Sequence, residues 1–287
     1  MGGGARGAYQ AGVLERLGQA LPELEFPIVT GVSAGAINAA YLCNSLQSFE
    51  GLSRALSQLW AGLDTQQVVR DAPLELLANV ARWSGQLMSG GGRAWSEARG
   101  LLDTAPLRAL LRQELSGPRG ELSGVTRNLA TGRLSALAIT TTDYGDGHAI
   151  TFVQQAPGRA VCWKRPQRVS VNAAISVDHV LASSAIPLLF PAVQIEGSWH
   201  GDGSVRDTAP LSPALHLGAD RILVISTVRG GSRRPPLMRK RPTAIRRWRG
   251  RAPQRAPQAC APSMLSCCAR PMTSPRSLQN MRSVCRA

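Results

Sequence analysis

The sequence predicts an α/β protein, in which strands and helices alternate through most of the chain. A β-branched run at 28–32 leads through a glycine-flanked turn into an alanine-rich helical pattern. Two β-rich runs, 134–142 and 148–154, flank a Tyr-Gly-Asp-Gly turn. Helical and strand patterns then continue to alternate as far as Val228. This alternation is typical of a layered α/β domain.

The charge of the chain divides it into two parts. The formal net charge is +15, from 33 Lys and Arg and 18 Asp and Glu. All 18 acidic residues and 19 of the basic ones lie within 1–231, which is therefore close to neutral. We expect one globular domain at 1–231 and a separate basic tail at 232–287. The nearly neutral charge of residues 1–231 does not indicate a nucleic-acid-binding protein.

The tail lacks the composition of a packed domain. It holds 14 basic residues, eight prolines, four cysteines and no acid in 56 residues. Such a segment cannot bury enough apolar surface to fold, so we expect disorder. The abrupt loss of every acidic residue also fits a shift of reading frame. The alternative is a basic arm that binds nucleic acid or an anionic membrane, but the order of its residues shows no pattern, and we expect no specific nucleic-acid partner.

The cysteines and the hydropathy of the chain indicate the cellular compartment. Cys43 and Cys162 stand alone in apolar surroundings, which favours small core residues over a disulfide framework. The tail cysteines form no C-x-x-C pair, so they do not predict a zinc site. The sequence shows no signal peptide and no apolar run near the roughly 20 residues of a membrane span. We expect a cytoplasmic protein that contacts a membrane surface transiently.

The chain opens on a glycine-rich loop that runs directly into a helix. Met1 to Gly7 read M-G-G-G-A-R-G, and leucines at 14, 17 and 21 then recur at helical spacing. The unhindered N–H groups of such a loop can hold an anion. A dinucleotide loop would need a strand before the glycines and a suitably placed acid after them, and neither is evident.

The remaining elements follow from periodicity and turn residues. We expect helices at 49–62, 73–83, 103–115, 178–184 and 209–217, a loop or cap at 84–100, a short hairpin at 193–200 and a buried strand at 221–228.

The turn after the first strand has the form of a nucleophile elbow. Gly31-Val32-Ser33-Ala34-Gly35 is a G-x-S-x-G motif between a strand and a helix, which is the context that the elbow requires. Gly31 and Gly35 allow the close approach of the neighbouring backbone. Ser33 would lie at the positive end of the helix, where negative charge is favoured.

A candidate base follows the predicted hairpin. Asp202 lies in Gly201-Asp202-Gly203-Ser204, where the flanking glycines leave its carboxylate accessible. Taken alone, Asp-Gly is more often simply a turn.

In this order, the glycine loop, the Ser33 elbow, the block 182–191 (ASSAIPLLFP) and the Asp202 loop resemble the patatin-like phospholipase family. The resemblance covers about residues 2–231. It implies a three-layer α/β/α fold with a mainly parallel sheet, a Ser33–Asp202 dyad, and hydrolysis of phospholipid or lysophospholipid acyl esters without metal or cofactor. It also implies an elbow at Gly31 and Gly35 and an aspartate loop with Gly203 and Ser204. The oxyanion hole would use Gly2, Gly3, Gly4 and their neighbours Arg6 and Gly7.

A histidine triad is the mechanistic rival. His216 follows Asp202, as the order Ser, acid, His would require, whereas the other three histidines precede it. Because His216 falls within a predicted helix, we expect it to be a packed or surface residue of that helix instead.

Two features depart from the family pattern. The family has a strand before the glycine loop, and here the sequence opens at the loop itself. The family also continues past the 221–228 strand into further helices, where this chain has its basic tail. An alternative hypothesis is therefore a truncated or frame-shifted member with impaired catalysis.

Overall fold

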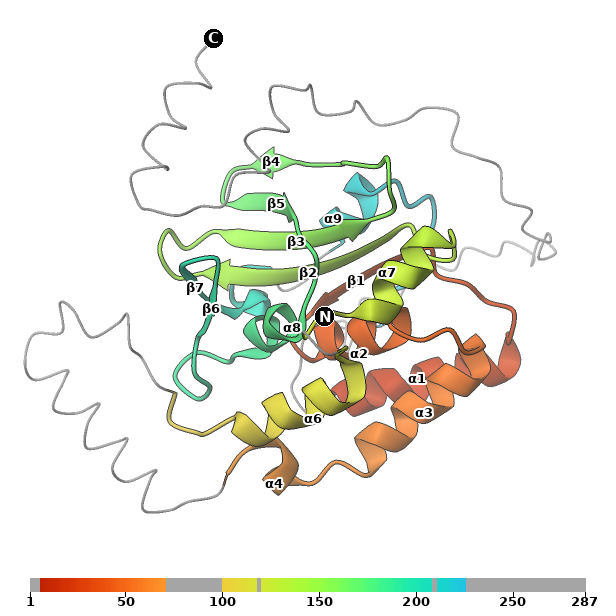
Figure 1. The fold of residues 1–287 in the computed structure, drawn as a ribbon, viewed down its shortest axis with the longest axis horizontal. Coiled ribbons are helices and arrows are strands. Elements are labelled where there is room, and N and C mark those ends of the chain that lie inside the picture. The colour runs from red at the N-terminus through yellow and green to blue at the C-terminus, as the bar shows by residue number, and fades with distance from the viewer. Residues whose placement is uncertain (1–5, 71–99, 118–119, 208–210, 226–287) are drawn as a thin grey trace, which may run out of the picture.

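The structure, a computed structural model, describes residues 6–70, 100–117, 120–207 and 211–225. It is a mixed α/β fold around a seven-stranded sheet with the order β4-β5-β3-β2-β7-β6, in which β1 also pairs with β2 (Figure 1). The strands are β1 (Ile28–Val32), β2 (Ala136–Asp143), β3 (Ala149–Gln155), β4 (Lys164–Arg165), β5 (Arg168–Asn172), β6 (Val193–Ile195) and β7 (Ser198–Asp202).

Helices cover the two faces of the sheet unequally. Figure 1 shows α2 and α8 next to the strands, with α1, α3, α4 and α6 stacked beyond them. The helices are α1 (Gly7–Ala20), α2 (Ala34–Cys43), α3 (Phe49–Ala61), α4 (Thr65–Val68), α6 (Ala105–Leu115), α7 (Ser123–Ala130), α8 (Val177–Ser184) and α9 (Ser212–His216), and Gly203–Val205 form a 3-10 turn, η3.

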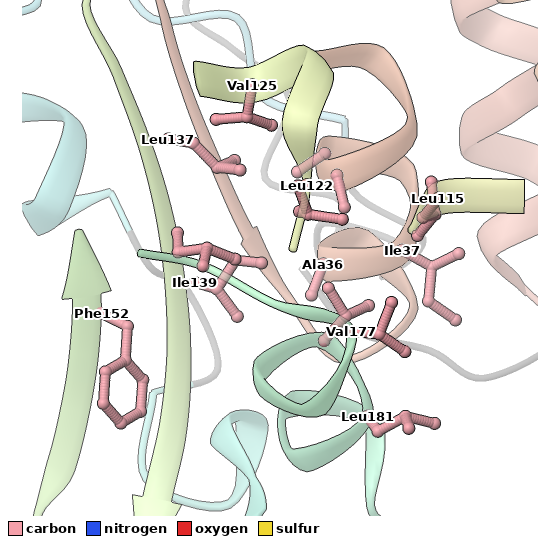
Figure 2. Close-up of a cluster of buried hydrophobic side chains, with 14 of the residues drawn as sticks. Ala36, Ile37, Leu115, Leu122, Val125, Leu137, Ile139, Phe152, Val177 and Leu181 are labelled. Carbon is pink, nitrogen blue, oxygen red and sulfur yellow. The ribbon is translucent and has the colours of Figure 1, made fainter. Parts of the chain in front are cut away.

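Alternate residues of β2 supply the core on both faces. Leu137 and Ile139 are fully buried in the main cluster, among side chains of α2, α6, α7 and α8 (Figure 2). Ala136 and Ala138 face the other way and pack with Leu217, which follows α9. Because side chains alternate along a strand, a strand that is buried throughout must be covered on both faces.

The expectation of a mainly parallel sheet is wrong. Only β1–β2 and β3–β5 are parallel pairs among the described strands, and the other four pairings are antiparallel. The connections explain this result, because a short turn can join only antiparallel neighbours. The turn between β6 and β7 consists of Glu196 and Gly197, both with positive φ, as a two-residue hairpin turn requires.

Most of the predicted elements have counterparts in the structure. The helix expected at 49–62 is α3, that at 103–115 is α6, that at 178–184 is α8 and that at 209–217 is the shorter α9. The runs 134–142 and 148–154 are β2 and β3, and the hairpin is β6–β7. The helix expected at 73–83, almost all of the loop at 84–100 and the tail at 232–287 lie outside the described residues.

The strand expected at 221–228 is not formed over its described part, residues 221–225. Ile222, Leu223 and Val224 are between 37% and 53% exposed there. An apolar β-branched run favours a strand, but it also needs a neighbouring strand that accepts its hydrogen bonds. The sequence pattern did not predict α4, α7 or the short strands β4 and β5.

The register of β2 brings two distant segments together. Val32, the last residue of β1, pairs with Thr140, and Asp202, the last residue of β7, pairs with Thr141. Both strands therefore lie along the same edge of β2 and meet end to end there. This meeting point places Ser33 beside Asp202.

Candidate active site

Ser33 lies in a strained turn between β1 and α2. Its backbone has φ 55° and ψ −133°, a region that costs a non-glycine residue about 1–3 kcal/mol. A Cβ on Gly31 would come within 2.5 Å of the Gly35 carbonyl oxygen and 2.7 Å of Ala36 Cα. The turn is thus tight enough to require glycine at position 31. It places Ser33 directly before the first turn of α2.

Asp202 lies against this turn. Ser33 Oγ donates a hydrogen bond to Asp202 Oδ2 at 2.6 Å, and both residues are 3% exposed. The other carboxylate oxygen accepts from Ser204 N–H at 2.8 Å and from Ser204 Oγ at 2.7 Å. The carboxylate is therefore held by Ser204 on one side, while its other oxygen is directed at the serine hydroxyl.

Gly203 makes this arrangement sterically possible. A Cβ at this position would lie 2.2 Å from the Thr140 carbonyl oxygen and 2.8 Å from Val32 Cγ2. Real Cβ contacts are never so short, so the loop after Asp202 can lie against β1 and β2 only with glycine here.

The start of α1 also reaches the turn. Asn38 of α2 donates through Nδ2 to the Gly7 carbonyl at 3.2 Å and to Gln10 Oε1 at 3.0 Å. Its Oδ1 accepts from Trp60 Nε1 at 2.7 Å. A Cβ on Gly7 would meet the Trp60 ring at 2.6 Å and Ala34 Cβ at 3.0 Å. Arg6 is exposed, and Gly2, Gly3 and Gly4 lie outside the described residues.

Tyr144 is a neighbour of Asp202 that sequence reasoning placed only in a turn. A Cβ on Gly201 would lie 1.9 Å from Tyr144 Oη, so the phenol covers the backbone next to Asp202. Burial raises the pKa of Tyr144, and the Asp202 carboxylate raises this pKa further. The phenol therefore stays protonated at neutral pH. A Tyr-Gly turn carries no signal that would have predicted this contact.

His216 is not brought to the pair. Its ring stacks on Trp163 with centroids 4.9 Å apart. Among the described residues, the hydrogen-bond partners of the Asp202 carboxylate are Ser33 and Ser204. His216 is half-buried and is the last residue of α9, in agreement with the helical residue expected there.

The rings of two buried histidines pack against Phe152. The rings of His179 and His200 lie 4.5 Å and 5.5 Å from the Phe152 ring. The pKa of His179 is lowered to about 4, first by burial and then by the nearby His200, while Asp178 opposes this shift. Burial also lowers the pKa of His200. His179 Nδ1 accepts from the Ser176 N–H at 3.1 Å, an arrangement that suits a neutral ring.

Acid should therefore destabilise the fold. The unfolded chain binds a proton at His179 near pH 6.5, whereas the folded chain binds it only near pH 4. The free energy of unfolding should fall as the pH drops through this window, by about 3 kcal/mol for His179 alone. Denaturant unfolding at pH 7.5 and pH 4 measures this, and His179→Gln should reduce the pH dependence. His216→Gln, on a less buried ring, is the control and should reduce it less.

The described residues contain no group of three or more His, Cys, Asp or Glu side chains placed to hold a metal ion. No helix among them is both long and apolar enough to cross a membrane. A cavity of about 270 Å³ opens beside Phe26, Val29 and Leu42, but neither Ser33 nor Asp202 lines it.

The chain is similar to a solved structure and matches a family of known proteins. The solved structure of VipD from Legionella pneumophila is similar at 17% identity, with a TM-score of 0.38. The similarity covers 72% of this chain and 45% of that one, so this chain spans less than half the length of VipD. No curated protein matches the chain significantly. The model of the family described as patatin-like phospholipase matches residues 1–215, which is most of the sequence, and the chain therefore belongs to that family.

Proposed function

We propose that this protein hydrolyses acyl esters of lipids, with Ser33 as the nucleophile and Asp202 as the base. The family is one of serine hydrolases that act on phospholipids. The observation that carries the residue assignment is the 2.6 Å hydrogen bond from Ser33 Oγ to Asp202 Oδ2. It occurs at a strained strand-to-helix turn, the setting in which a serine hydroxyl acts as a nucleophile.

The reaction then proceeds in two halves. Ser33 Oγ attacks the ester carbonyl carbon while its proton passes to Asp202 Oδ2. The tetrahedral intermediate collapses, the leaving alcohol takes that proton, and the acyl group stays on Ser33. A water molecule then attacks the acyl-enzyme and gives a proton to Asp202. This proton returns to Ser33 as the fatty acid leaves, which restores both residues.

The oxyanion would be held by N–H groups of the glycine loop, Gly2, Gly3 and Gly4, together with Arg6 and Gly7. The bond from Asn38 to the Gly7 carbonyl supports this proposal, because it ties the end of that loop to the helix that follows Ser33. The N-terminus of α2 adds a positive potential at the same place. Loss of one such donor typically slows turnover by about 10²–10³-fold.

The substrate we propose is a phospholipid or lysophospholipid, reached by transient contact with a membrane surface. Several exposed apolar side chains belong to residues that are near Asp202 in the sequence or near residues that contact its loop. Val205 on η3 is 54% exposed, and Tyr144, which covers Gly201, is 44% exposed. Leu188 and Leu189 are also exposed, and they follow Ala185, whose carbonyl accepts the Asp202 N–H.

The test is the release of fatty acid from vesicles and from a soluble short-chain ester by the purified full chain. Hydrolysis of both substrates, abolished by a serine-directed phosphonate, is the expected result. A folded protein that hydrolyses neither would instead support the alternative of an impaired family member. Activity that the phosphonate leaves intact would contradict a serine mechanism.

Gly203→Ala should remove most of the ester turnover, at least about 10-fold. The added methyl group has no room against Thr140 and Val32, so Asp202 must move away from Ser33. Gly12→Ala is the matched control, because a Cβ there meets nothing within 4 Å on an exposed face of α1. Short-chain ester kinetics on both variants check the prediction, which fails if Gly203→Ala is as active as the control.

A further inference from the structure

Ser183, near the end of α8, is a buried serine to which the sequence motifs assign no role. It is fully buried, with a relative exposure of 0%. Its Oγ accepts a hydrogen bond from the Ser33 backbone N–H at 3.0 Å and donates one to the Thr140 carbonyl at 2.7 Å. We propose that Ser183 is a positioning residue that fixes the strained backbone of Ser33 for reaction. This inference rests on the proposed function of Ser33.

The hydroxyl bridges the turn at the point where β1 leaves the sheet. Val32 is the last residue of β1 to pair with β2, and its partner is Thr140. The next N–H along the chain, that of Ser33, has turned away from the strand direction and is bonded to Ser183 instead. Through Ser183 the N–H is still tied to the Thr140 carbonyl. The relay therefore replaces the ladder bond that the turn interrupts.

The C-terminal end of α8 also leads to a residue that binds the backbone of Asp202, the proposed base. The Ala185 carbonyl, two residues beyond Ser183, accepts the Asp202 N–H at 2.8 Å. The backbone of the proposed nucleophile and the backbone of the proposed base are thus both fastened to residues 183–185. This common support sets the distance between Ser33 Oγ and Asp202 Oδ2.

Loss of the Ser183 hydroxyl would leave a buried N–H and a buried carbonyl without this partner. The Ser33 backbone, held at a positive φ, would relax toward an ordinary conformation and carry Oγ out of line with Asp202. A misplacement of about 1 Å of a reacting group can cost about 10²-fold in rate. The loss should appear in kcat, since Ser183 is buried and does not touch the substrate.

The neighbouring residue provides a matched control. Ser184 is also buried, but among the described residues its hydroxyl donates only within its own helix, to the Val180 carbonyl at 2.7 Å and the Leu181 carbonyl at 3.3 Å. Ser184→Ala therefore removes a buried hydroxyl from the same turn of α8 without touching Ser33. The pair of variants separates positioning of Ser33 from general effects on the helix.

The experiment compares kcat and KM for a short-chain ester in the parent, Ser183→Ala, Ser184→Ala and Ser183→Cys, with Ser33→Ala as reference. We expect Ser183→Ala to lower kcat by about 10-fold or more with KM within about threefold, and Ser184→Ala to change kcat by less than about threefold. Ser183→Cys keeps the site filled with a slightly larger and weakly hydrogen-bonding group, and it should show the kcat loss even where the alanine variant folds poorly.

Parent-like kcat in Ser183→Cys, or equal losses in the Ser183→Ala and Ser184→Ala variants, would overturn the positioning role. If the positioning role is overturned in this way while Ser33→Ala is inactive in the same assay, the proposed function of Ser33 is unaffected. An active Ser33→Ala would instead refute the function itself.

Discussion

Ser33→Ala should abolish ester hydrolysis, with turnover reduced by about 10³-fold or more. The reason is that the change removes the hydroxyl that donates to Asp202 Oδ2 from the strained turn, which is the group proposed to attack the ester. The fold should survive, because within the described part of the chain the Ser33 side chain makes a single hydrogen bond, to Asp202, whereas its backbone bond to Ser183 remains. Far-ultraviolet circular dichroism and short-chain ester kinetics together make the measurement.

The control for this change is Ser116→Ala at the end of α6. Its hydroxyl donates to the Arg112 carbonyl, far along the chain from the elbow, and it should turn over ester like the parent. Equal rates for Ser33→Ala and the parent would remove Ser33 as the nucleophile.

Asp202→Asn should be nearly as damaging as the serine change. The amide is close in shape to the carboxylate and can still contact Ser33 and Ser204, but it cannot take up the hydroxyl proton. We expect a loss of about 10³-fold in kcat with little change in melting temperature. Kinetics on a soluble ester avoid any effect of the membrane surface.

His216→Ala decides between the dyad and a triad. The ring stacks on Trp163, so its loss should affect stability slightly and turnover by less than about threefold. If His216→Ala cost about 10³-fold and Asp202→Asn much less, the assignment of Asp202 as the base would be wrong.

The sequence patterns predicted those features of the site that are formed by residues close together in the chain. The strand, turn and helix around Ser33 each have a direct signal in the residue types and spacing of residues 28–42. Asp202 was harder to predict, since Asp-Gly is usually only a turn. It stood out through its order relative to the other motifs, and the register of β2 then placed it next to Ser33.

The misses concern contacts between distant segments. Ser183 and Ser33 are 150 residues apart, and nothing in a pair of adjacent serines tells which hydroxyl faces another strand. The mainly parallel sheet was expected from the family resemblance, and it was wrong because β2–β3, β4–β5 and β6–β7 are antiparallel neighbours joined by short turns. The run at 221–225 is apolar and β-branched, yet strand formation depends on a neighbouring edge that the run itself does not encode.

The most direct test of Ser33 as the nucleophile is to find where a serine-directed phosphonate attaches. The full chain is incubated with a fluorophosphonate, digested, and analysed by mass spectrometry, with Ser33→Ala and Asp202→Asn treated in parallel. We expect one adduct, on Ser33, formed in step with the loss of ester turnover. We expect no adduct in Ser33→Ala and much slower labelling in Asp202→Asn. An adduct on another serine that accounts for the lost activity would contradict this assignment.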